Sequence, residues 1–187
     1  MFAYAIFQAL PAQREDERLA RIAPYYWLAS IANSTWIFLW HYQVFTLTIV
    51  AMGTLLLSLI AIYQVAKRST GIESRGFRWA VLVPFSIYLG WISVATIANV
   101  SQLLFFLEWD MWGLSAELWT GIMLVVATGL GMAMLERERD IAFVLVLIWA
   151  FVGIAVAHAD VMLVATSAWV VSGVLGLGVL VAAVIRV

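Results

Sequence analysis

The chain has 187 residues, of which 65% are hydrophobic and 11% are charged, and its formal net charge is −1. A soluble domain carries about 25% charged residues, so this composition predicts an integral membrane protein with membrane lipid as a partner. The sequence contains no cysteine, which excludes disulfides, thiolate catalysis and Cys-ligated metal centres. The charge balance provides no basic field, and this excludes nucleic acid as a partner.

Apolar segments long enough to cross a bilayer follow one another along the chain. A membrane-spanning helix needs about 20 predominantly apolar residues. The predicted spans are residues 24–41, 44–66, 79–107, 117–135, 141–157 and 161–185. The apolar residues 1–10 reach only about 15 Å as a helix, which is half of a bilayer core. The predicted fold class is therefore an all-α integral membrane protein, a bundle of about six transmembrane helices with a short N-terminal helical stub.

The basic residues gather at one end of these predicted spans. All ten Lys and Arg fall in residues 11–23, 67–78 and 136–140 and at the C-terminus. Basic residues near span ends favour the cytoplasmic side. These segments are therefore predicted to be cytoplasmic, in a multi-pass protein of a bacterial cytoplasmic membrane. The opposite ends of the spans carry acidic residues, two histidines and several tryptophans.

A polar and aromatic seam runs along the third predicted span. Its members follow one another at steps of 3, 4, 4 and 3 residues: Tyr88, Trp91, Ala95, Asn99 and Gln102. These steps keep the residues on one face of a helix with 3.6 residues per turn. Amide, phenol and indole groups are unfavourable against lipid tails, so this face should look into the bundle or into a cavity. The seam predicts one wall of a ligand pocket.

A second seam lies in the first predicted span. Asn33, Trp36 and Trp40 share a helical face at steps of 3 and 4 residues. One interpretation is an asparagine that bonds to a neighbouring helix, with tryptophans in the interface belt. The other interpretation is a second wall of the same pocket.

Together the two seams resemble the TspO/MBR family, the tryptophan-rich sensory proteins related to the mitochondrial translocator protein. The family motif Leu-Asn-x-x-Trp-x-x-x-Phe-Phe is matched by Asn33-x-x-Trp36-x-x-x-Trp40, and Pro-Tyr-x-x-Trp-x-x-x-Ala-Thr-x-x-Asn is matched by Trp91-x-x-x-Ala95-Thr96-x-x-Asn99. The pair Pro84-Phe85 stands three residues further from the tryptophan than in the family. The resemblance covers residues 2–102.

The resemblance implies a bundle that binds a porphyrin-type tetrapyrrole or a similar lipophilic ligand, such as a sterol, for sensing or transport. It implies a Trp-lined pocket with Asn33, Trp36, Trp91, Ala95 and Asn99 as ligand-binding residues. The seams add Trp40, Tyr88 and Gln102 to this predicted site. No cofactor is certain, and a porphyrin-type tetrapyrrole is expected as ligand.

The family pattern also divides the chain. Residues 1–108 are predicted to form the TspO-like region, and residues 109–187 to add three transmembrane helices packed in the same bundle. The family's first helix and most of its second have no counterpart before residue 11, so an N-terminus that looks truncated is expected.

Several alternatives stay open. His41 and His158 are weak candidates for a metal or haem ligand, because interfacial histidines are more often solvated. Glu108, Asp110 and Glu117 would be the acid and base groups of a tetrapyrrole- or lipid-modifying enzyme. Small residues at four-residue spacing in the last three spans permit close helix approach, within one chain or in a homodimer. A structural subunit of a larger membrane complex is a further alternative.

Overall fold

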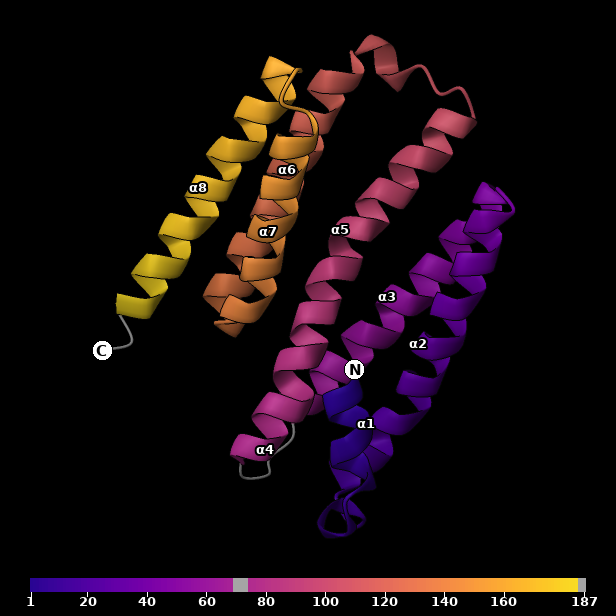
Figure 1. Cartoon of the computed structure of the whole chain (residues 1–187), viewed down its shortest axis with the longest axis vertical. Helices are drawn as coiled ribbons and strands as arrows, with labels where there is room; N and C mark the ends of the chain where they lie inside the picture. The colour runs from indigo at the N-terminus through magenta and orange to yellow at the C-terminus, as the bar shows by residue number, and fades with distance from the viewer. Residues whose placement is uncertain (69–73, 185–187) are drawn as a thin grey trace.

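The computed structural model describes residues 1–68 and 74–184, and all regular structure in that part of the chain is helical (Figure 1). The helices are α1 (Phe2–Ala9), α2 (Glu17–His41), α3 (Phe45–Arg68), α4 (Arg75–Phe77), α5 (Val83–Phe106), α6 (Ala116–Ala133), α7 (Ile141–Ala157) and α8 (Met162–Val184). The predicted all-α membrane bundle is confirmed. Part of the predicted 67–78 connection and the C-terminal residues 185–187 lie outside the described residues.

The number of membrane spans differs from the prediction of about six. In the described part of the chain, four helices are long and apolar enough to cross a membrane: α3, the continuous helix Arg75–Phe106, the helix Ala116–Glu138, and α8. The fifth, α7, is apolar but has 17 residues, about 25 Å at 1.5 Å per residue. The sixth, α2, begins with charged residues and carries many polar and aromatic side chains, which lower its hydropathy below that of the others.

Helix α2 begins seven residues earlier than predicted, inside the segment expected to be a charged loop. The carboxylate of Asp16 accepts a hydrogen bond from the backbone N–H of Arg18 at 2.9 Å and caps the helix. An N-cap aspartate satisfies one of the unpaired N–H groups of the first turn. The cap therefore extends α2 into residues 17–23.

The long helices form two groups, α2, α3 and α5 in one and α6, α7 and α8 in the other (Figure 1). On one side, α2 packs along α3 and α3 along α5; on the other side, α6 and α7 both pack on α8. Helix α5 joins the groups by packing on α7, whereas it touches α6 only slightly. We call α2, α3 and α5 the packed half of the bundle. We call α5, α6, α7 and α8 the hollow half, because a cavity lies between α5, α6 and α7.

Gly90 lies where α5 crosses α7. A Cβ atom added there would lie 3.0 Å from the carbonyl oxygen of Phe143 and 3.2 Å from the Cβ of Val146. The backbone of α7 cannot move away from an added Cβ unless the whole helix moves. The absence of a side chain at residue 90 therefore sets the distance between the two groups of helices.

A buried carboxylate joins the groups at the end that carries the basic residues. Asp140 is 9% exposed and caps α7 by accepting a hydrogen bond from the N–H of Phe143 at 3.1 Å. Tyr63 of α3 donates its hydroxyl to Asp140 Oδ2 at 2.7 Å, and Ser86 of α5 donates to Oδ1 at 2.6 Å. One side chain thus ties three helices together.

Pro84, in the first turn of α5, changes the hydrogen-bonding pattern of the helical turn that precedes it. Proline lacks an N–H and its ring clashes with the carbonyl group four residues earlier. Residues Arg78–Leu82 form a π-helical turn, and α5 begins at Val83. The wider turn accommodates the proline without breaking the helix Arg75–Phe106.

The predicted N-terminal stub is α1, and it docks on the packed half through one tyrosine. Tyr4 is fully buried, and its ring lies 4.9 Å from the rings of both Tyr26 and Phe85. Stacked and edge-on aromatic pairs at such distances stabilise packing. Its hydroxyl group has no hydrogen-bond partner among the described residues.

Candidate functional site

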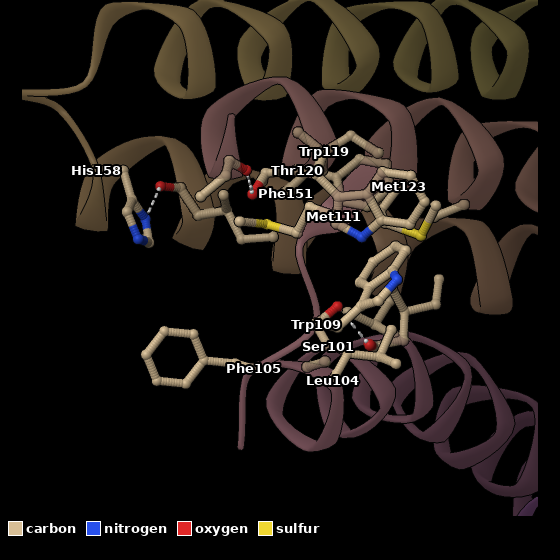
Figure 2. A pocket seen from close by; sticks show the side chains of 17 residues that line it. Ser101, Leu104, Phe105, Trp109, Met111, Trp119, Thr120, Met123, Phe151 and His158 are labelled. Carbon is tan, nitrogen blue, oxygen red and sulfur yellow. Dashed lines mark hydrogen bonds between the residues drawn. The ribbon is translucent and has the colours of Figure 1, made fainter. Parts of the chain in front are cut away.

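A cavity of about 350 Å³ lies between α5, α6, α7 and the connection from α5 to α6 (Figure 2). Helix α5 contributes Val94, Ile97, Ala98, Ser101, Leu104 and Phe105, and the connection contributes Trp109 and Met111. Helix α6 contributes Ala116, Trp119, Thr120, Met123, Leu124 and Ala127, and α7 with its C-cap contributes Phe151, Ile154 and His158. The space exists because α6 packs on α8 and hardly touches α5.

Apart from the indole N–H groups of two tryptophans, the wall of this cavity carries three polar side chains, and each of these bonds to its own helix. Ser101 donates its hydroxyl to Ile97 O at 3.0 Å, and Thr120 donates to Ala116 O at 2.8 Å. His158 Nδ1 lies 3.2 Å from Ile154 O, which favours the tautomer with the proton on Nδ1. The hydroxyl oxygens and His158 Nε2 keep lone pairs for a ligand.

Three tryptophans form a cluster at the end of the cavity. The ring centroids of Trp109, Trp112 and Trp119 lie 5.0–5.5 Å apart in edge-on pairs. Trp109 and Trp119 line the cavity, while Trp112 is 74% exposed. Indole faces offer a large rigid surface to a flat apolar ligand.

The connection that carries Trp109 and Met111 is held in strained backbone conformations. Glu108, Met111 and Trp112 have φ values of 54°, 51° and 55°, a region that residues with a Cβ rarely adopt. The strain is offset locally, because Asp110 Oδ1 accepts a hydrogen bond from the N–H of Trp112 at 3.1 Å. Strained backbone of this kind concentrates at functional sites.

Two side chains mark the exposed side of the cavity. Figure 2 places His158 and Phe105 together on one side of it, away from Met123 on the other. Phe105 is 77% exposed and His158 is exposed. The cavity is therefore open between the ends of α5 and α7.

The two predicted seams contact each other directly, through hydrogen bonds and side-chain packing. Asn99 is 2% exposed; its Oδ1 accepts a hydrogen bond from Trp36 Nε1 at 3.3 Å, and its Nδ2 donates to Thr48 Oγ1 at 2.9 Å. Trp36 also stacks on Trp40 at 5.1 Å. These contacts join α2, α3 and α5 where the prediction placed a ligand.

The remaining predicted residues lie in different surroundings. Tyr88 and Ala95 are partly buried against the core. Trp91 is 44% exposed and its ring lies 5.4 Å from the ring of Trp149 on α7. Asn33 and Gln102 are partly buried. None of the eight predicted ligand-binding residues is among those that line the cavity.

The two histidines differ in position. His41 is exposed and its ring lies 5.1 Å from the ring of Tyr42, whereas His158 lines the cavity. Within residues 1–68 and 74–184, no three His, Cys, Asp or Glu side chains are grouped closely enough to hold a metal ion. The carboxylates Glu108, Asp110 and Glu117 are all exposed.

Residues 1–181 match a family model described as TSPO-like protein. The chain belongs to this family. The match extends beyond residues 2–102, where the motifs lie, and includes α6, α7 and most of α8. No curated protein and no solved structure matches the chain. The four long apolar helices and the family together establish a TspO-type integral membrane protein.

The cavity-lining residues of this TSPO-like chain escaped the sequence analysis for a geometric reason. On α5 they occupy positions 94, 97, 98, 101, 104 and 105, each next to or near a member of the predicted seam. A shift of one position rotates the face by about 100° around a helix. The lining face has few polar groups, so it resembles any lipid-facing surface. The signal that could have identified it is the grouping of Trp109, Trp112 and Trp119 in and just after the connection from α5 to α6.

Proposed function

We propose that this TspO-type membrane protein binds a small lipophilic ligand in the cavity between α5, α6 and α7, in a sensing or transport role. The observation that carries the proposal is an apolar space of about 350 Å³ with two indole rings in its wall. Ligand sites in proteins are concave, mostly apolar and about 300–1,000 Å³ in volume, with a few polar groups that orient the ligand.

The lining suits a ligand with a flat apolar body. Trp109, Trp119 and Phe151 contribute aromatic rings, and Met111 and Met123 contribute flexible apolar side chains. Methionine adapts its shape to irregular ligands, and indole faces favour stacking on a π-system. A tetrapyrrole or a smaller polycyclic compound has this character, and the lone pairs of Ser101 and Thr120 would orient its polar edge.

We further propose that the cavity lies toward the non-cytoplasmic side of a bacterial cytoplasmic membrane. The basis is the distribution of basic residues, which favours the cytoplasm for the end of the bundle that holds α1, α4 and the turn between α6 and α7. The cavity is at the opposite ends of α5 and α7.

The test measures binding of a neutral planar probe, 9-anthracenemethanol, to the purified protein in a neutral detergent. Energy transfer from tryptophan to the probe gives a dissociation constant that is separable from partition into micelles, because only binding saturates. Ala98→Phe fills the cavity, because Ala98 lines it. Val100→Phe is the matched control: it is an exposed position of the same helix outside the lining.

We expect saturable binding in the wild type and in Val100→Phe, and at least about tenfold weaker binding in Ala98→Phe. The predicted seams are tested in the same assay with Trp36→Phe and Trp91→Phe. Binding that weakens in these two variants and not in Ala98→Phe would move the ligand to the seams. Equal affinity in Ala98→Phe and the wild type would remove the cavity as the site.

A further inference from the structure

We infer that His158 determines which flat ligands the cavity prefers: its imidazolium form binds an acidic group at the mouth, while the aromatic wall holds the apolar body. This inference rests on the proposed ligand binding and adds to it the residue that recognises the ligand's acidic group. Binding of such a ligand should strengthen as the pH falls through the range in which histidine takes up a proton, near pH 6.5.

Among the residues that the structure describes, His158 is the one cavity-lining residue that can carry a charge. The other lining side chains are apolar, hydroxyl-bearing or indole groups, and none is Lys, Arg, Asp or Glu. A carboxylate in an apolar site is strongly unfavourable unless a cation pairs with it. An acidic ligand in this cavity therefore takes its counter-charge from His158.

The position of His158 suits the acidic end of an amphiphilic ligand. It is the C-cap of α7 and is exposed. Figure 2 shows its ring on the same side of the cavity as Phe105, whereas the indole rings of Trp109 and Trp119 lie toward Met123. A ligand with its rings against the tryptophans and its carboxylate at the mouth keeps its charged end partly in water, which limits the cost of desolvation.

The hydrogen bond that holds the His158 ring is compatible with the protonated form. Nδ1 lies 3.2 Å from the carbonyl oxygen of Ile154. A carbonyl oxygen only accepts hydrogen bonds, so Nδ1 carries the proton in this contact. Uptake of a second proton from solvent on Nε2 leaves this bond intact, and the Nε2–H group can then donate to the ligand. Hydrogen bonds between an imidazolium and a carboxylate are charge-assisted and about twice as strong as neutral ones.

The other titratable groups at this end of the hollow half keep one charge over the relevant pH range. The part of α5 that lines the cavity (94–105) and the whole of α8 carry no titratable side chain. Four carboxylates on the neighbouring segments are exposed and lie outside the lining: Glu108, Asp110, Glu117 and Asp160. Carboxyl groups titrate near pH 4, so these acids stay ionised between about pH 5.5 and pH 8. A change in ligand affinity over this range therefore points to histidine.

The experiment compares 9-anthracenecarboxylate with the uncharged 9-anthracenemethanol at about pH 5.5 and about pH 8. Each probe is titrated into the purified protein in a neutral detergent, and tryptophan energy transfer gives the dissociation constant. We expect the carboxylate to bind at least about fivefold more tightly at the lower pH, a modest gain because the ion pair is partly solvated. The affinity for the alcohol should change by less than about twofold, because the alcohol has no charge to pair.

Substitutions at residue 158 test the cause of the pH dependence. His158→Gln keeps a hydrogen-bond donor but cannot take up a proton, so the affinity for the carboxylate should lose its pH dependence. His158→Lys carries a fixed charge through this range, so the carboxylate should bind tightly at both pH values. The matched control is His41→Gln, at an exposed position outside the lining, and it should keep the pH dependence of the wild type.

Linkage provides a second measurement on the unaltered protein. If protonation of His158 strengthens binding of the carboxylate, the bound carboxylate must raise the pH at which His158 titrates by the same free energy. A fivefold ratio of affinities corresponds to about 0.7 pH unit. The sequence contains two histidines, so NMR titration of the imidazole signals distinguishes them with the help of the His41→Gln variant. We expect the midpoint of His158 to rise and that of His41 to stay unchanged.

Two results would overturn the role of His158: an affinity for the carboxylate that is the same at both pH values, or an unchanged pH dependence in His158→Gln. In either case, saturable binding of the alcohol that is lost in Ala98→Phe keeps the proposed function. Absence of saturable alcohol binding in the wild type removes the proposed function and the role of His158 with it. If His158→Gln does not fold, His158→Lys and the NMR titration decide.

Discussion

The packed half and the hollow half share α5 but use different faces of it. The face with Asn99 meets α2 and α3 through two hydrogen bonds, and Asn99 is buried there. The face about 100° away, with Ala98 and Ser101, borders a cavity. In this membrane bundle the strongest polar signal therefore marks contact between helices, and the cavity lies where the side chains are mostly apolar.

Side-chain size and connection length explain the difference. In the packed half, Trp40, Phe45 and Phe106 follow one another with ring centroids 5.2 Å apart and fill the end of the bundle. In the hollow half, residues 107–115 join α5 to α6, and this long connection lets α6 pack on α8 and away from α5. Trp109 of the connection and Trp119 of α6 line the resulting space without filling it.

The largest expected effect comes from removing the carboxylate that ties the two halves together. Asp140→Ala leaves the hydroxyls of Tyr63 and Ser86 without their acceptor and removes the N-cap of α7. We expect the free energy of unfolding to fall by about 3 kcal/mol or more, measured by circular dichroism during titration with sodium dodecyl sulfate.

The control for this prediction is Glu136→Ala, at an exposed position four residues earlier. We expect this change to alter the free energy of unfolding by less than about 0.5 kcal/mol. An equal loss in both variants would contradict the role of Asp140 as a joint between the halves.

The next effect concerns the spacing of the halves. Gly90→Val places a branched side chain 3.0 Å from the backbone of α7 at Phe143, so α5 and α7 must separate. We expect a loss of about 2–3 kcal/mol in the free energy of unfolding. Gly153→Val, on an exposed face of α7 with no atom within 4 Å of an added Cβ, should cost less than about 1 kcal/mol. A comparable loss in both would refute the tight crossing at Gly90.

A smaller effect distinguishes the role of the packed half from that of the hollow half. Asn99→Ala removes the hydrogen bonds to Trp36 and Thr48, and side-chain hydrogen bonds between membrane helices contribute about 0.6–1.7 kcal/mol each. We expect unfolding to become easier by about 1–2 kcal/mol, while the dissociation constant of 9-anthracenemethanol changes by less than about twofold. Lost binding with unchanged stability would instead assign Asn99 to the ligand site.

The smallest effect is a pH dependence at the start of the packed half. The Arg18 side chain donates hydrogen bonds to Asp16, and this holds the pKa of the Asp16 carboxyl below its usual value. The pair therefore stabilises the fold above the ordinary carboxyl range, near pH 4, and this contribution is lost as the pH falls through the lowered pKa.

Asp16→Asn keeps the cap of α2 but removes the negative charge. This variant therefore measures the contribution of the Asp16–Arg18 ion pair to stability. We expect the wild type to be more stable than the variant by about 1 kcal/mol or less at pH 6, and the difference to shrink toward pH 3. A difference that grows on acidification would contradict the pairing with Arg18.

Composition and periodicity were sufficient for the membrane class, the all-helical fold and the position of most helices, because burial of apolar length in lipid depends on local sequence alone. The motif residues Trp36 and Asn99 were predicted as two walls of one pocket, and in the structure they share a hydrogen bond. The position of the cavity could not be predicted from the periodicity of the sequence. Whether α5 faces a neighbour at position 98 or 99 depends on how α6 packs on α8, which is a long-range choice. The start of α2 was misplaced because the cap at Asp16 outweighed the charges that follow it.

Two helix ends in the structure share one unusual turn. After α2 and after α5, a residue with a side chain takes the left-handed conformation at the place where glycine is common: Gln43 has φ 58° and Glu108 has φ 54°. The turns close through bonds from Val44 N to Leu39 O at 2.9 Å and from Trp109 N to Leu104 O at 3.0 Å. Glycine at either position would relieve about 1 kcal/mol of strain. Residue 43 lies outside the cavity lining, whereas residue 108 directly precedes Trp109, which lines the cavity. Laboratory evolution for heat resistance should therefore accept glycine readily at residue 43, whereas at residue 108 the added backbone freedom would also act on the position of Trp109.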